Sequence, residues 1–166
     1  MTRDEVLLRL RDGRAEFEAR LSAIPRGALE QVTPGGAHSP KDIVAHITAY
    51  EELVVQRLRA ARRGETTVFD RDRVGWKAFN ERIWNEVASV DVETVLAHAD
   101  EVFADLLEEV AQLSDEELAA PTGATAALDP AWLEGEPVWK LIYIDVFDHY
   151  PMHHAALEAA ARTTES

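Results

Sequence analysis

Four stretches of the sequence place apolar residues three or four positions apart, which is the period of an amphipathic α-helix. These stretches span residues 2–24, 39–64, 91–113 and 137–162. An amphipathic helix must bury its apolar face against another element, and no stretch of useful length alternates like a β-strand. The pattern therefore predicts an all-α protein whose long helices pack on one another.

Helix-boundary residues support these limits. Ser39 followed by Pro40 is a strong start signal, because serine caps a first turn and proline fits the first helical position. Pro25 ends the first helix, and Gly64 follows the second. Gly75 weakens the segment 70–88, which we expect to be short or broken. We predict an up-and-down-type four-helix bundle with this additional short helical segment, formed as a single domain by residues 1–166.

The charge and composition narrow the range of partners and locations. The formal net charge of −14 repels phosphate backbones and anionic lipid, so we predict no nucleic-acid and no membrane partner. No apolar run is long enough to span a bilayer and no signal peptide is evident, so a cytoplasmic location is expected. Cysteine is absent, which excludes thiolate ligands and a cysteine nucleophile but not a thiol cofactor or substrate.

Three of the six histidines fall on the inward faces of the predicted helices. His46 shares its face with Ile43 and Ile47. His149 and His153 are four residues apart, so they lie on one face of the last helix, where two imidazoles can chelate one ion. A buried polar group without a partner costs roughly 1–3 kcal/mol. We therefore interpret these three histidines as ligands of a divalent metal ion, with three core histidines satisfied by protein groups and water as the alternative.

Two further residues are candidates for a catalytic role. Asp145 lies four residues before His149, so it is a fourth ligand, an acceptor that orients a ligand histidine, or a pocket residue that faces water. Tyr50 lies one turn after His46, where its hydroxyl can donate to a substrate oxygen. Pro151 predicts a kink or a one-turn bulge, because its missing N–H removes a helical hydrogen bond.

The other basic, aromatic and histidine residues are interpreted as structural or surface residues. The basic cluster at the end of the second helix is interpreted as a solvated last turn, with an anion-binding patch as the alternative; its members are Arg57, Arg59, Arg62 and Arg63. Five aromatic residues are interpreted mainly as ordinary core or rim, with pocket walls as the alternative: Trp76, Trp84, Trp132, Trp139 and Tyr150. Three histidines have no paired ligand on their face and are assigned to loops or the surface: His38, His98 and His154.

Two short motifs resemble those of a known family. Residues 39–51, Ser-Pro-Lys-Asp-Ile-Val-Ala-His-Ile-Thr-Ala-Tyr-Glu, resemble the second-helix signature of the DinB-like superfamily. Residues 148–153, Asp-His-Tyr-Pro-Met-His, resemble the last-helix signature of its DfsB/ClbS-like branch, and residues 74–86 are similar to the middle region of that branch. The sequence departs from the pattern at Pro151, where a polar helix former is usual, and at Asp145, where asparagine is expected.

The resemblance implies a four-helix bundle in which His46, His149 and His153 bind a divalent ion, often nickel, zinc, iron or manganese. It also implies a homodimer and a small-molecule substrate, handled by a metal-dependent hydrolase or by a thiol-dependent transferase that uses a low-molecular-weight thiol. The branch includes a self-resistance hydrolase that acts on a genotoxic natural product. The alternative is a non-catalytic module that binds or sequesters a small molecule, with a vestigial or structural metal site.

Overall fold

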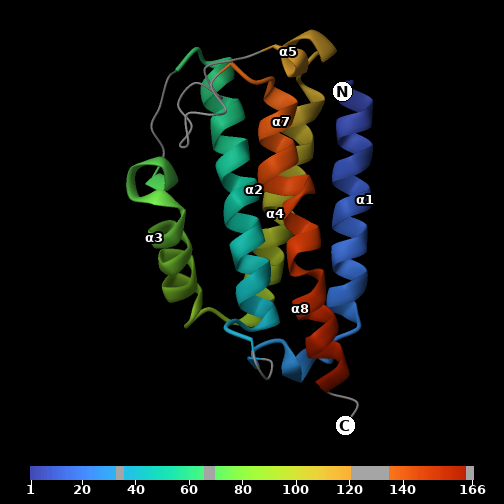
Figure 1. Cartoon of the computed structure of the whole chain (residues 1–166), viewed down its shortest axis with the longest axis vertical. Helices are drawn as coiled ribbons and strands as arrows, with labels where there is room; N and C mark the ends of the chain where they lie inside the picture. The colour runs from blue at the N-terminus through green and yellow to red at the C-terminus, as the bar shows by residue number, and fades with distance from the viewer. Residues whose placement is uncertain (33–35, 66–69, 121–134, 164–166) are drawn as a thin grey trace.

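A computed structural model describes residues 1–32, 36–65, 70–120 and 135–163 of the chain (Figure 1). Side chains are described for the same residues except 70–73. Trp132 and most of the loop expected before the last helix lie outside the described residues.

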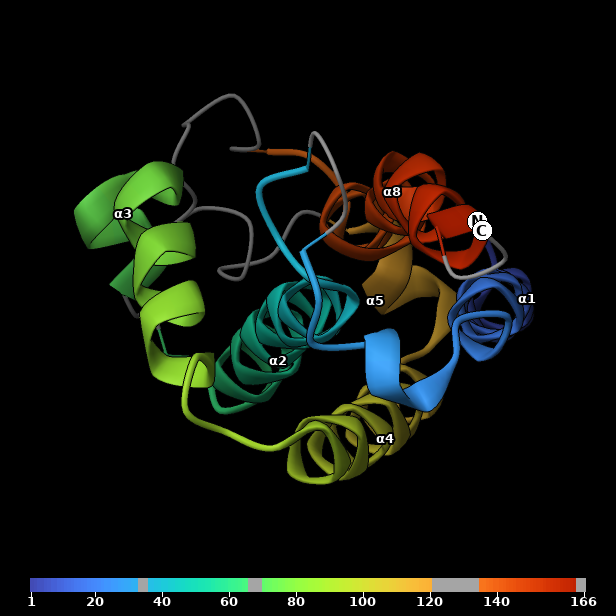
Figure 2. The ribbon, with the colours of Figure 1, turned by 90° about the horizontal axis from the view of Figure 1, so that it is seen from below.

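Four long helical stretches pack side by side and confirm the predicted all-α bundle. They are α1 (Arg3–Ser22), α2 (Pro40–Arg62), α4 (Val92–Ala111) and a C-terminal stretch composed of α7 (Val138–Ile142), η3 (Tyr143–Phe147) and α8 (His149–Thr163). Seen along the bundle, α4 contacts both α1 and α2, and the C-terminal stretch closes the ring between α2 and α1 (Figure 2). The short elements η1 (Arg26–Ala28) and α5 (Asp115–Ala119) lie at opposite ends of the bundle (Figure 1).

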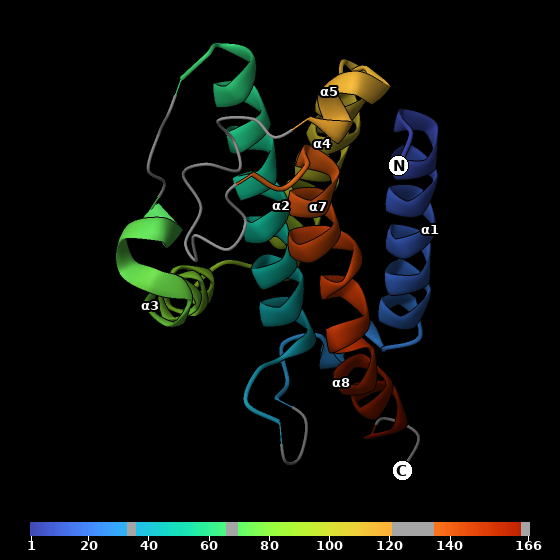
Figure 3. The same cartoon turned by 45° about the horizontal axis from the view of Figure 1, so that its top comes forward.

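The additional helical segment is α3 (Asp70–Val87), which lies on the outside of α2 (Figure 3). It returns the chain along the bundle, so that α2 and α4 run in the same direction. Gly75 interrupts α3 with φ 77° and ψ 158°, a left-handed conformation that glycine adopts without strain. The expected weakening of this segment is therefore a real break between two helical pieces.

The helix starts follow the capping signals in the sequence. Ser39 Oγ accepts the N–H of Asp42 at 3.2 Å, and the Asp42 carboxylate accepts the N–H of Ser39 at 2.9 Å. The same reciprocal pattern starts α1 at Thr2 and α5 at Ser114. These bonds satisfy the first-turn donors that a helix leaves unpaired, so each cap fixes where its helix enters the bundle.

The core consists of one main apolar cluster and one small satellite. Apolar side chains from α1, α2, α4, α7 and α8 form the main cluster between the four helical stretches. The satellite consists of Tyr50, Phe79 and Ile83, and it attaches α3 to α2. None of the helices in the described part of the chain is long and apolar enough to cross a membrane.

Two expectations about individual elements need correction. Arg57 is not part of a solvated last turn, because its side chain is 1 % exposed and pairs with Asp145. The last helix is not continuous from residue 137 to residue 162, because the π-helical turn η3 separates α7 from α8.

Candidate metal centre

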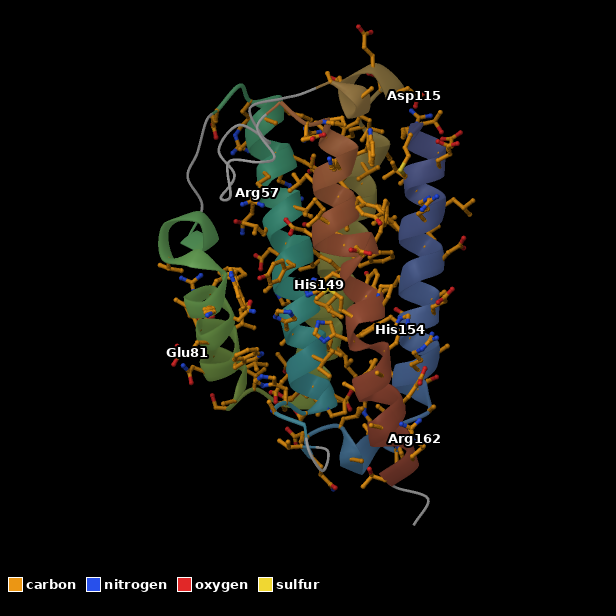
Figure 4. The ribbon with its side chains drawn as sticks, in the orientation of Figure 1. Arg57, Glu81, Asp115, His149, His154 and Arg162 are labelled. Carbon is orange, nitrogen blue, oxygen red and sulfur yellow. The ribbon has the colours of Figure 1, made fainter. Side chains whose placement is uncertain are left out.

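His46, His149 and His153 meet between α2 and α8. One ring nitrogen from each lies within 4.8 Å of the other two. The closest pair is His46 Nε2 and His149 Nε2, which are 2.9 Å apart although the residues are 103 positions apart in sequence. Figure 4 shows His149 on the side of its helix that faces α2.

The π-helical turn η3 immediately precedes the two histidines of α8. The N–H of Asp148 donates to the carbonyl of Tyr143 at 2.8 Å, five residues back instead of four. α8 then begins at His149, so Pro151 falls in a first turn, where proline is tolerated because the N–H has no helical partner. The irregularity expected from Pro151 therefore lies one turn before it, in η3.

The three imidazoles are in the form that binds metal. Burial, and then the nearby His149 and His153, lowers the pKa of His46 to about 3. Burial and His153 lower the pKa of His149 to about 4, although the backbone of Asp145 acts in the opposite direction. Burial also lowers the pKa of His153. All three rings are thus neutral near pH 7, as metal ligation requires.

The spacing of one pair of the clustered nitrogens fits ligands of a shared first-row ion. Two nitrogens that are each about 2.05 Å from a shared ion lie about 2.9–3.4 Å apart for angles between about 90° and 110°. His46 Nε2 and His149 Nε2 fall at the short end of that range. Among the described residues, one nitrogen of each ring is also buried without a hydrogen-bond partner: His46 Nδ1, His149 Nδ1 and His153 Nε2. The unpaired Nδ1 atoms of His46 and His149 are not the Nε2 atoms that face each other, so an ion held by Nε2 would leave them as they are. The metal interpretation therefore rests on the convergence of three neutral rings on one point.

Tyr50 lies against the histidine cluster. Its ring centroid is 5.0 Å from that of His46 and 4.7 Å from that of His149. Its hydroxyl donates to Asn80 Oδ1 at 3.0 Å, so α3 contributes a buried amide beside the cluster. This position of Asn80 could not be predicted from the sequence, because no helical spacing connects it to residues of α2.

Asp145 is not one of the three clustered ligand groups. Its carboxylate is buried, and Oδ2 accepts from Arg57 Nη1 at 3.2 Å. The extra negative charge that distinguishes this chain from the asparagine expected at that position is therefore paired with the guanidinium of Arg57. The burial of Arg57 had a signal in the sequence, because helical spacing places Arg57 on the α2 face that carries Tyr50 and Val54. The neighbouring arginines nevertheless favoured a solvated last turn.

The remaining histidines separate as expected from the cluster, with one unforeseen contact. His154 lies on the side of α8 that faces α1 (Figure 4), and His98 is exposed at 3.9 Å from Glu52. His38 stacks on Trp84, with ring centroids 3.8 Å apart and an interplanar angle of 24°. Trp76 is 56 % exposed, and so is neither core nor an enclosed pocket wall.

A model of the DinB superfamily matches residues 9–140. The chain belongs to the DinB superfamily. The match covers most of the chain and confirms the resemblance read from its motifs, but it ends before His149 and His153. No curated protein matches the sequence.

Solved structures of similar shape place this DinB-superfamily protein beside DfsB and ClbS. The structure described as "Sibling Lethal Factor Precursor - DfsB" has a TM-score of 0.83 at 13 % identity, over 100 % of this chain and 98 % of that one. The colibactin self-resistance protein ClbS, solved in complex with double-stranded DNA, has a TM-score of 0.75 at 15 % identity, over 99 % of this chain and 96 % of that one. An uncharacterised protein of Escherichia coli UTI89 has a TM-score of 0.80 at 16 % identity, over 99 % and 95 % of the two chains. At these identities the similarity establishes the shared fold.

Proposed function

We propose that this DinB-superfamily protein binds one divalent metal ion through His46, His149 and His153 and uses it to transform a small molecule. The observation that carries the proposal is that three ring nitrogens from α2 and α8 lie within 4.8 Å of one another. Three histidines leave coordination positions for other groups, as catalytic rather than structural sites do.

When bound by these three histidines, a divalent ion would lower the pKa of water or of a thiol at its open positions, and would so supply a nucleophile near neutral pH. Tyr50 would act as a hydrogen-bond donor to the substrate, and Asp145 as a base. The Tyr50 hydroxyl donates to Asn80, and a substrate oxygen that takes the place of this amide as acceptor receives the same O–H. The Asp145 carboxylate is held one turn before His149 by Arg57, where it serves as a base for the nucleophile.

The test of the ligand set is the metal content of matched variants. We expect wild-type protein to bind one equivalent of Zn²⁺ or Ni²⁺, and His46→Ala and His149→Ala to weaken binding by more than about 100-fold, since loss of an outer partner alone costs about 10–100-fold. His154→Ala is the control, because this histidine is adjacent to His153 but faces α1. Equally tight binding by all three variants and wild type would show that the ligand set is wrong.

The reaction class is tested with simple probes. Hydrolysis of 4-nitrophenyl acetate by the zinc-loaded protein, lost in His46→Ala, supports a hydrolase. Conjugation of glutathione to 1-chloro-2,4-dinitrobenzene with the same dependence supports a thiol transferase. Turnover that persists in His46→Ala excludes the metal from either reaction.

The second candidate is a resistance-type module that sequesters a small molecule. It is favoured by the similarity in fold to ClbS, which is described as a self-resistance protein. A compound bound in stoichiometric amount and recovered unchanged from the metal-loaded protein supports this function over catalysis. A homodimer is proposed for either function, and sedimentation of the purified protein at the mass of two chains tests it.

A further inference from the structure

A cavity of about 130 Å³ opens beside two of the proposed ligands. Its outer rim is formed by exposed residues of two separate segments, Ala37 before α2 and Ala156 in α8. Its inner lining includes buried Ile43 and the rings of His46 and His153. The cavity therefore leads from solvent to the candidate metal centre.

One wall of this cavity is aromatic. His38 and Trp84 both line it and stack on each other, and the Trp84 ring centroid is 6.2 Å from that of His46. His38 precedes α2 whereas Trp84 belongs to α3, so the stacked pair also joins α3 to the loop before α2. An aromatic wall favours an aromatic partner, because rings pack well in offset-stacked or edge-to-face arrangements.

The cavity lining is almost free of charge. Among the described residues that line it, none is an aspartate, glutamate, lysine or arginine, and the polar groups are the three histidines and the indole N–H of Trp84. Apart from the proposed ion at its inner end, the lining offers no counter-charge, so a charged group held along the wall would lose its hydration without compensation. The size is also restrictive, since an apolar cavity of about 150 Å³ is known to accommodate one benzene molecule.

We propose that this cavity is the specificity pocket of the metal centre, and that it takes an uncharged, flat substrate group up to the size of one benzene ring. The inference rests on the proposed metal role of His46, His149 and His153, and adds the substrate class. The group enters past Ala156, lies along Trp84 and places its attached polar atoms at the ion. Trp84 and Ala156 are thus specificity-determining residues.

The test compares two hydroxamates, which share one metal-binding group and differ only in the attached group. Zinc-loaded protein is titrated with benzohydroxamate, which carries a phenyl ring, and with acetohydroxamate, which carries a methyl group. We expect benzohydroxamate to bind at least about tenfold more tightly, because only the ring fills the cavity. Trp84→Ala should reduce the affinity for benzohydroxamate about tenfold.

Two variants with enlarged side chains, one at this cavity and one at another, test whether the preference for the phenyl ring arises in this cavity. Ala156→Leu narrows the rim, and should abolish the preference for the phenyl ring while leaving the zinc content and the affinity for acetohydroxamate unchanged. Thr94→Leu enlarges an exposed side chain at a separate cavity between α2, α3 and α4, and should leave the preference intact. Thermal unfolding of each variant verifies that it is folded.

The outcomes separate this inference from the metal proposal. Zinc-loaded protein that binds the two hydroxamates equally, or keeps its preference in Ala156→Leu, overturns the pocket assignment alone. Wild-type protein that binds no zinc overturns the metal centre and with it this pocket's ligand.

Discussion

Glu51 is fully buried in α2, on the side of the helix that faces α1 and α8. Its Oε1 accepts a hydrogen bond from the hydroxyl of Tyr150, and its Oε2 lies 3.6 Å from Arg14 Nη1. Burial raises the pKa of this carboxyl to about 7, against the opposing effects of Arg14 and Tyr150. The group is therefore half protonated near neutral pH, next to the helix turn that carries Tyr50.

This shift has a predictable effect on stability. The unfolded chain releases the proton near the ordinary pKa of 4.5, whereas the folded protein keeps it until about pH 7. The stabilisation is thus complete below pH 4.5 and is lost as the pH rises through 7. We expect the free energy of unfolding of wild type, relative to Glu51→Gln, to fall by up to about 3 kcal/mol between pH 5 and pH 8.

Urea unfolding of both proteins at the two pH values measures this difference. Glu52→Gln is the control for net charge, since it removes a carboxylate from the next, partly exposed position. A wild-type advantage or disadvantage over Glu51→Gln that is the same at both pH values contradicts the prediction.

At this scale the sequence predicts which histidines cluster better than it predicts the residues around them. His149 and His153 share a face by helical spacing, and His46 joins them because its neighbours are apolar. Glu51 and Arg57 are buried by partners 99 and 88 positions away, Tyr150 and Asp145. Such contacts cannot be recognised from a local sequence pattern, because their formation depends on how the two helices are rotated relative to each other.

The helical elements show how a proline is accommodated between two proposed ligands. The hydrogen bond from Asp148 to Tyr143 gives η3 one extra residue, and α8 starts afresh at His149. Pro151 thereby avoids the cost of about 3 kcal/mol that proline imposes inside a helix. The break also sets the rotation at which α8 presents its histidines to α2.

Replacement of Pro151 tests this role of the break. Pro151→Ala restores an N–H that can bond to the preceding turn, which favours a continuous helix and rotates His149 relative to His46. We expect the affinity for Zn²⁺ to fall about tenfold, in the range found for changes around metal ligands. Competition with a chelator measures this affinity.

Met152→Ala is the matched control, because Met152 is the next residue and 73 % exposed. Its affinity for Zn²⁺ should equal that of wild type. An unchanged affinity in Pro151→Ala would mean that other contacts fix the rotation of α8. The sequence indicated an irregularity here but not its position, because a π-helical turn depends on the packing of both flanking turns.

Across the whole molecule, the proposed ion would link helices from distant parts of the chain. His46 belongs to α2 and the other two ligands to α8, near the C-terminus (Figure 1). A ligand that binds only the folded state stabilises it by about 2.7 kcal/mol at 100 times its dissociation constant. For a chain of this size, we expect Zn²⁺ at that excess to raise the melting temperature by about 5–10 °C.

Differential scanning calorimetry with and without Zn²⁺ measures this shift. The shift should disappear in His46→Ala and on addition of EDTA. A rise of equal size in His46→Ala would place the stabilising zinc elsewhere on the protein.

The net charge of the molecule leads to a prediction about DNA. The formal charge of −14 opposes approach to a phosphate backbone, because DNA binds proteins mainly through basic residues that neutralise phosphates and release their counterions into solution. ClbS shares the fold and was solved with double-stranded DNA, but at 15 % identity the fold alone is shared. We expect no binding of a 20-base-pair duplex at 150 mM salt in fluorescence anisotropy, and saturable binding at that salt would refute the prediction.

The bundle as a whole was predictable because four long amphipathic stretches leave few alternatives. Its internal order was not, since the parallel direction of α2 and α4 depends on the course of α3 outside the bundle (Figure 3). The family match supports the fold through residue 140, whereas the bundle places His149 and His153 opposite His46.

The residues around the candidate metal centre belong to two differently anchored parts of the fold. The proposed ligands belong to helices of the main core. Trp84 and Asn80 belong to α3, which joins the main core at its last residue, Val87, and is otherwise anchored by the satellite cluster of Tyr50, Phe79 and Ile83. Segments with few buried apolar contacts form separate cooperative units that open at lower free energy than the core. Transient detachment of α3 would therefore admit or release a substrate while the ion stays bound, so that exchange of small molecules and retention of metal are governed by different unfolding events.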